Sequence, residues 1–220
     1  MKAGWTGISC ALVVMTVVAA SPASATSITY VLNQSGTGPV GTAGTITLDD
    51  AGDNSVEIVV TLNEGYEFVT TGAGDALAFN LLGDPAITID DITDGFAIGP
   101  TNHNEPPFGT FHYSVSCTSG CGSGGSNPHP GLLSFDVLLT GITVDSFVGS
   151  SKGFYFASDL IGPGANGAPA TGNVGAKGGV TTTDVTPVPE PASLLLFGSG
   201  LIGSVYKWRR KRRQGEIESI

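Results

Sequence analysis

The sequence between residues 26 and 180 predicts an all-β protein, a single antiparallel β-sandwich domain. Apolar and polar residues alternate with a period of two, and no stretch keeps a 3.6-residue period over three turns. The alternating runs are short and are separated by Gly, Pro and Asn, as is typical of a sandwich. Roughly 160 residues are enough for one domain with its own hydrophobic core.

The clearest local element is a β-hairpin near the start of this domain. Residues 45–48 alternate, residues 49–54 are rich in turn formers, and residues 55–62 alternate again. Further strands are expected at residues 28–32, 66–70, 76–82, 86–92, 111–117, 132–139, 142–148 and 154–158. The segment 162–179 has few bulky side chains, so it is expected to form a long loop or a poorly paired edge.

The charge of the predicted domain is strongly acidic. Sixteen Asp and Glu residues lie between residues 26 and 184, against only Lys152 and Lys177. Phosphate binding needs clustered Lys and Arg, so nucleic acid is excluded as a partner. Anionic lipid surfaces would repel the domain as well. The acidity is best explained by solubility in an extracellular setting.

Cys117 and Cys121 are the cysteines left if the N-terminal stretch containing Cys10 is removed. Outside the cytoplasm, such a pair predicts a disulfide that closes a tight turn. The alternative is a redox-active or metal-binding pair. The spacing is not Cys-x-x-Cys and there is no second pair, which favours the disulfide.

Three histidines, His103, His112 and His129, fall in or near the same region, residues 103–129. Their grouping raises the hypothesis of a metal site. Because they lie in Pro- and Asn-rich loops or alternate outward with serines, we expect scattered surface histidines. Whether this loop region binds anything is left open by the sequence.

Two acidic groups are candidate calcium ligands. Each places three carboxylates within five residues beside Asn or Gly, and turns that carry oxygen ligands suit calcium. The candidates are Asp49, Asp50 and Asp53, and separately Asp90, Asp91 and Asp94. Neither group matches the EF-hand loop, and Asp is also a common turn residue. No other cofactor is expected.

The sequence carries no sign of catalysis. It contains no Gly-x-Ser-x-Gly elbow after an apolar strand, and its Gly-rich stretches lack the Lys-Ser/Thr pair of a phosphate-binding loop. No Asp or Glu is marked by its context as buried, as a glycosidase acid would be. We therefore expect a protein that is not an enzyme.

The N-terminus, residues 1–25, has the pattern of a secretory signal peptide. Lys2 precedes an uncharged apolar run at residues 8–20, and Ala23 and Ala25 form a small-x-small cleavage site. The run is shorter than the ~20 residues that span a bilayer. Thr26 is the expected mature N-terminus. The alternative is an uncleaved N-terminal anchor.

The C-terminus has three consecutive parts. An extended linker, residues 181–191, ends in Pro189, Glu190 and Pro191, and an apolar run at residues 192–206 predicts one short transmembrane helix. A basic tail, residues 207–220, follows and is expected to stay in the cytoplasm. Its stop-transfer charges are Lys207, Arg209, Arg210, Lys211, Arg212 and Arg213.

This arrangement resembles the PEP-CTERM sorting signal of Gram-negative bacteria. The resemblance covers about 25 residues and leaves the domain upstream unassigned. It implies processing by an exosortase, transient contact with the inner membrane, and export to the cell surface or into an exopolysaccharide matrix. The alternative is an ordinary single-pass anchor behind a Pro-rich linker.

Three functions remain for the ectodomain. The first is a structural or adhesive role at the cell surface or in the matrix. The second is a calcium-assisted glycan-binding module. The ectodomain has no Trp for sugar stacking, which leaves only the tyrosines, Tyr30, Tyr66, Tyr113 and Tyr155. The third is an extracellular hydrolase.

Overall fold

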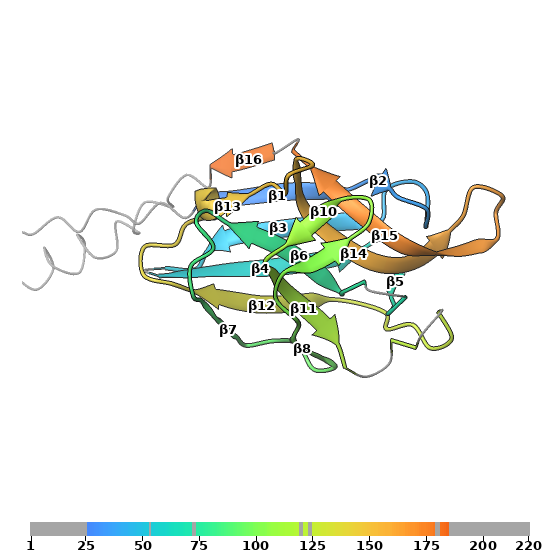
Figure 1. The fold of residues 1–220 in the computed structure, drawn as a ribbon, viewed down its shortest axis with the longest axis horizontal. Helices are drawn as coiled ribbons and strands as arrows, with labels where there is room; N and C mark the ends of the chain where they lie inside the picture. The colour runs from blue at the N-terminus through green and yellow to red at the C-terminus, as the bar shows by residue number, and fades with distance from the viewer. Residues whose placement is uncertain are drawn as a thin grey trace, which may run out of the picture. The chain divides into compact units, whose positions relative to one another are not determined.

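The computed structural model describes residues 26–52, 54–71, 74–118, 121–122, 125–178 and 181–184 (Figure 1). The predicted signal peptide, Pro-Glu-Pro motif, transmembrane helix and basic tail lie outside these residues. Within the described part of the chain, no helix is both long and apolar enough to cross a membrane.

The described chain folds into two antiparallel sheets and a separate hairpin. The first sheet has the strand order β16 (Thr181–Asp184), β1 (Thr26–Leu32), β3 (Gly44–Asp50), β4 (Ser55–Leu62), β12 (Leu133–Leu138), β7 (Thr88–Asp90). The second has the order β2 (Gln34–Ser35), β15 (Pro169–Lys177), β14 (Phe154–Pro163), β6 (Leu77–Leu81), β11 (Tyr113–Cys117), β8 (Phe96–Ile98). Two short strands join the second sheet, β5 (Glu67–Phe68) on β14 and β13 (Phe147–Val148) on β6.

The main core lies between the two sheets, because alternate residues of each strand face inward. Ile58 and Phe135 of the first sheet and Phe79 and Phe156 of the second are fully or almost fully buried in one cluster. Phe79 is the centre of this cluster. Its ring centroid lies 5.4 to 6.5 Å from the centroids of Tyr113, Phe135, Phe147 and Phe156. The all-β sandwich predicted from the sequence is confirmed.

A smaller second core lies on the outer face of the second sheet. The hairpin of β9 (His103–Glu105) and β10 (Gly109–Phe111) is not hydrogen-bonded into either sheet. Its Phe111, together with Phe108 of the connecting turn, packs against Ala78 of β6 and Ala157 of β14. Figure 1 shows the hairpin in front of these strands. Side chains on the inner side of β9 are therefore enclosed between the hairpin and the sheet.

The predicted hairpin at residues 45–62 is confirmed. β3 and β4 pair in register from Gly44 opposite Leu62 to Asp50 opposite Val56. The turn between them uses Gly52 and Asn54, whose φ angles of 121° and 77° lie in the left-handed region. These residue types adopt that region most readily, which is why the sequence signal was clear.

The expected loop at residues 162–179 was wrong. β14 extends to Pro163, and β15 fills residues 169–177 in the interior of the second sheet, between β2 and β14. The residues of β15 are small where the large side chains of neighbouring segments cover the strand. A Cβ on Gly175 would come within 3.0 Å of the rings of Phe154 and Phe108.

The expected strand at residues 142–148 is replaced at its centre by a short 3₁₀ helix, η1 (Val144–Ser146), and only its end, β13 (Phe147–Val148), is a strand. The Thr143 backbone N–H donates to Ser146 Oγ at 3.1 Å, and the Val144 N–H donates to Asp50 Oδ1 at 3.0 Å. These side-chain acceptors satisfy N–H groups that a strand would have paired along its length.

The two ends of the domain lie side by side at one edge of the first sheet. β16 pairs with β1, with Thr26 opposite Asp184 (Figure 1). Residues 181–184 of the predicted linker thus form a strand, and residues 185–191 lie outside the described residues. The expected mature N-terminus, Thr26, is also the first residue of β1.

Candidate functional site

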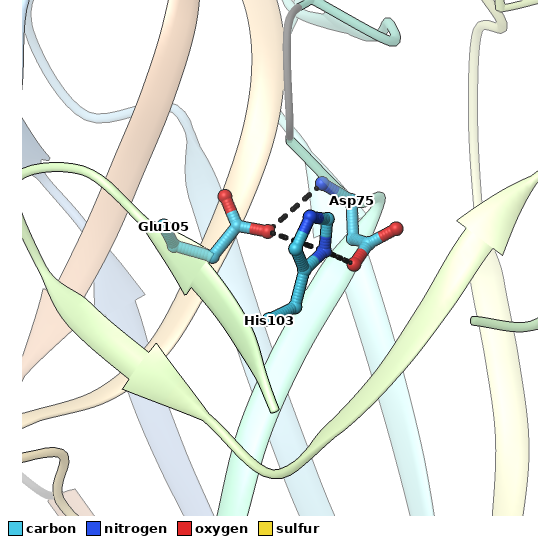
Figure 2. A group of neighbouring side chains, drawn as sticks. All are labelled: Asp75, His103 and Glu105. Atoms are coloured by element: carbon cyan, nitrogen blue, oxygen red, sulfur yellow. Dashed lines mark hydrogen bonds and ion pairs between the residues drawn. The ribbon is translucent and has the colours of Figure 1, made fainter. Parts of the chain in front are cut away.

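The most unusual side chains of the domain lie beneath the β9–β10 hairpin. His103 and Glu105 are two residues apart on β9, so both point inward from the hairpin. Asp75 meets them from the segment that leads into β6. Figure 2 shows the three side chains pointing toward one another, and we call them the β9 cluster. Asp75 is 4% exposed, Glu105 is 0% exposed and the His103 side chain is 22% exposed.

Hydrogen bonds and ion pairs join the members of the β9 cluster. His103 Nδ1 contacts Asp75 Oδ2 directly and lies 3.6 Å from Glu105 Oε1. The Asp75 backbone N–H donates to Glu105 Oε1 at 3.0 Å. Ser116 Oγ donates to Asp75 Oδ1 at 2.5 Å. The other carboxylate oxygen of Glu105, Oε2, is buried without a hydrogen-bond partner.

A third buried carboxylate, Asp159 of β14, lies close to the cluster and is 0% exposed. It accepts hydrogen bonds from Thr71 Oγ1 at 2.6 Å and from the Thr71 backbone N–H. Its own backbone N–H donates to the Asp75 carbonyl at 2.8 Å. Gly74 is required here because a Cβ at that position would come within 2.5 Å of the Asp159 carboxylate.

Burial makes these carboxyl groups hard to ionise. Burial first, and the charge of Asp75 second, raise the pKa of Glu105 to about 8. The Asn173 amide lies close enough to lower that pKa, but it donates to the Pro106 carbonyl and makes no hydrogen bond of ordinary geometry to Oε2. Burial also raises the pKa of Asp159 to about 6, against the lowering effect of its bonds from Thr71.

The sequence did not identify this site. All three histidines are half-buried rather than exposed, so the expectation of surface histidines was wrong. His112 Nδ1 lies 3.0 Å from Asn102 Oδ1, and the His129 ring packs on Phe96 with its Nδ1 buried. The sequence context marked no acid as buried, yet Asp75, Glu105 and Asp159 are each at most 4% exposed. The pattern His103-Asn104-Glu105 was the available signal, since alternation places its first and third side chains together.

The Cys117–Cys121 disulfide predicted from the sequence is present, with a Cα–Cα distance of 5.9 Å. It follows directly on β11, which ends at Cys117. Both residues are half-buried and pack against the main core. The bond therefore ties the loop after β11 to the edge of the sandwich.

The acidic groups named as calcium candidates are partly brought together. Asp49 pairs with Glu57, Glu57 pairs with Asp136, and Asp136 pairs with Asp90, across four neighbouring strands. These four side chains form a row on the outer face of the first sheet. The Asp50 carboxylate accepts a hydrogen bond from the Val144 N–H. Asp91 and Asp94 are exposed, and Asp53 lies outside the described residues.

Like charges directly opposite one another destabilise a sheet. Burial, followed by the charges of Glu57, Asp91 and Asp90, raises the pKa of Asp136 in the folded state. A raised pKa means that the folded protein binds this proton more tightly than the unfolded chain. The destabilisation caused by the ionised Asp136 is therefore fully present above the pKa of Asp136 in the folded protein. It disappears as the pH falls below the pKa of this group in the unfolded chain.

We expect Asp136→Asn to stabilise the domain at pH 7 by roughly 0.2–1 kcal/mol, the usual size of a cross-strand pair. The gain in Tm should shrink as the pH is lowered into the aspartate range, and as salt is added. Thermal melts of the variant and of Asp94→Asn, an exposed acid outside the row, check this. A gain that is the same at pH 3 and pH 7 would contradict the explanation.

A cleft lies at the free edges of the two sheets, β7 and β8. It has a volume of about 470 Å³ and is largely apolar, with Ile87, Ile89 and Ile98 among its lining residues. Ile98, at the cleft, is 61% exposed. The Tyr113 hydroxyl lies at the cleft but donates to the Pro85 carbonyl.

Comparison with known proteins gives one match, at the C-terminal end. Residues 187–213 match the family model described as the PEP-CTERM protein-sorting motif. The chain carries a PEP-CTERM sorting signal. The match includes Pro189, Glu190, Pro191 and the basic residues through Arg213, which are the residues that suggested the resemblance. No curated protein and no solved structure matches the chain, and the family of the ectodomain is unidentified.

The PEP-CTERM signal makes this an exported protein whose sorting depends on an exosortase. It begins at residue 187, three residues beyond the end of β16 at Asp184. The ectodomain and its sorting signal are therefore almost contiguous in sequence.

Proposed function

We propose that the ectodomain is a structural or adhesive component of a polysaccharide layer at the cell surface, and that it has no catalytic role. The observation that carries this proposal is the position of the apolar cleft relative to β16, the strand that precedes the sorting signal in the sequence. The chain leaves the first sheet at β16, and the cleft lies at β7, the opposite edge of that sheet. Five strand spacings of about 4.8 Å separate the two edges, about 24 Å in all.

This geometry suits a domain held at one edge and exposed at the other. The chain continues toward the sorting signal from β16, at one edge of the first sheet. The β7–β8 edge, with Ile98 exposed, is then free to contact the surrounding layer. An apolar cleft can cover the C–H face of sugar rings without the positive charge that this acidic domain lacks.

The arrangement of the acids supports a role without catalysis. Glycoside hydrolysis usually needs two carboxyl groups facing one substrate. Each of three clefts lined by described residues contains a single acidic residue, Asp84 in two of them and Glu67 in the third. The acids that do lie together, Asp75, Glu105 and Asp159, are buried at 4% exposure or less.

A calcium-assisted glycan-binding module has less support. Stacking on sugars requires exposed aromatic faces. Tyr30, Tyr66 and Tyr113 are each at most 9% exposed, and Tyr155 packs with a centroid distance of 5.1 Å against Tyr30. The carboxylate row on the first sheet is the remaining feature in favour of calcium.

The test measures how much protein is retained in the extracellular matrix fraction of the native host. Ile98→Asp places a charge in the cleft on a side chain that is 61% exposed, so the fold should persist. The matched control is Leu132→Asp, which adds the same charge at a side chain that is 52% exposed and away from the cleft. We expect matrix retention to fall severalfold for Ile98→Asp alone. Equal retention of both variants and wild type would contradict adhesion through the cleft.

A further inference from the structure

The β9 cluster poses a problem of charge. Asp75, Glu105 and Asp159 are buried close together, and buried carboxylates must be protonated, paired with a cation, or bound to a metal. The ectodomain offers few cations. Lys177 lies over the Phe154 ring at 5.4 Å, and Lys152 is exposed. Among the described residues, His103 is the one basic side chain that forms an ion pair with the carboxylates of Asp75 and Glu105.

We propose that Asp75, His103 and Glu105 bind a divalent transition-metal ion, with Zn²⁺ as the first candidate. Each residue offers one ligand atom, and these atoms all lie within 4.8 Å of one another. A tetrahedral zinc site with ligand distances of about 2.0–2.2 Å places its ligand atoms about 3.4 Å apart. Small side-chain movements would bring the three donors to that spacing.

A second, independent observation supports a cation here. Glu105 is 0% exposed, and its Oε2 has no hydrogen bond of ordinary geometry, although the Asn173 amide lies nearby. A buried acceptor without a donor carries an unfavourable desolvation cost, which a bound cation would offset. Figure 2 shows one carboxylate oxygen of Glu105, Oε1, toward Asp75 and His103 and the other directed away from them, so Oε2 would reach a metal among the three only after the carboxylate rotates.

The surroundings of the cluster resemble the outer shell of a metal site. Ser116 Oγ holds Asp75 Oδ1, which leaves Oδ2 directed at His103. The Asp75 N–H fixes the Glu105 carboxylate at 3.0 Å. Hydrogen bonds of this kind orient metal ligands and tune their basicity. The small core of Phe108 and Phe111 keeps the hairpin, and with it His103 and Glu105, against the sheet.

The donor set selects the kind of metal. One imidazole nitrogen with two carboxylates suits zinc, manganese or a related ion. Calcium takes six to eight oxygen ligands and does not favour nitrogen. This site is therefore distinct from the calcium candidates at residues 49–53 and 90–94. Its partly exposed member, His103, is the point from which an ion would enter.

The test uses the mature protein purified from its host and stripped of metal with a chelator. It is titrated with ZnCl₂, MnCl₂ and CaCl₂ in separate series, and bound metal and Tm are measured. We expect one equivalent of Zn²⁺ to bind, with Tm rising by about 5–10 °C at a hundredfold excess over Kd. Binding of calcium alone, or of none of the three ions, would overturn the proposal.

Two variants and one control locate the site. His103→Gln and Glu105→Gln should each weaken Zn²⁺ binding about 100-fold or more, since each removes a ligand. His112→Gln, at the histidine held by Asn102, should bind as wild type does. If a variant does not fold, X-ray absorption spectroscopy of the zinc-loaded wild type identifies the ligands instead. We expect one imidazole and otherwise oxygen ligands at about 2.0–2.2 Å. Sulfur ligands, or several imidazoles, would contradict the assignment.

Discussion

Phe79→Ala is expected to lower the free energy of unfolding by about 3–5 kcal/mol, a large part of the stability of one domain. Phe79 is 0% exposed, and its ring lies among four other aromatic rings drawn from β11, β12, β13 and β14. Those rings belong to both sheets, so they cannot collapse together into the space that the missing ring leaves.

Urea denaturation of the ectodomain measures this effect. The matched control is Leu82→Ala, three residues further along the chain, where the side chain is 75% exposed. We expect the control to change stability by less than about 0.5 kcal/mol, as surface substitutions usually do. A loss below 1 kcal/mol for Phe79→Ala would mean that the two sheets do not share the core described here.

Replacement of Pro189, Glu190 and Pro191 by alanines is expected to abolish C-terminal processing. These residues lie within the PEP-CTERM match and precede the apolar run. Without recognition by the exosortase, the chain should accumulate with residues 207–220 still attached. Cell fractionation, with detection of a tag placed after residue 26, would follow the full-length species and the shortened one.

The control replaces three residues just upstream, Thr181, Thr182 and Thr183, with alanine. They belong to β16 and lie outside the matched motif. We expect processing of this variant to match that of wild type. Normal processing of the Pro-Glu-Pro variant would show that the enzyme reads another part of the tail.

The sequence predicted most of the fold because alternation is a local signal. β4 was located at its observed bounds, and β1, β3 and β12 to within two residues at each end, because their inner faces carry an unbroken series such as Val56, Ile58 and Val60. β15 was missed because it faces neighbouring aromatic rings with Gly175 rather than with large apolar side chains. A strand covered on its outer face by another segment loses the usual pattern.

The β9 cluster was missed for a related reason. Asp75 precedes β6, whereas His103 and Glu105 lie about thirty residues later on β9, and only the packing of the hairpin on the second sheet unites them. The sequence predicted two of the four acids in the carboxylate row on the first sheet. Asp49 and Asp90 were named, but Glu57 and Asp136 join them only through strand register. Turn composition identifies acids that are near in sequence, whereas register brings together those that are not.

Exosortase-dependent sorting is tested most directly by the intact mass of the protein recovered from each cell fraction of its native host. We expect a species that starts at Thr26, ends near Pro189, Glu190 and Pro191, and lies outside the inner membrane. A species in the inner membrane that retains residues 207–220 would contradict exosortase-dependent sorting. It would identify the protein instead as a permanently anchored domain.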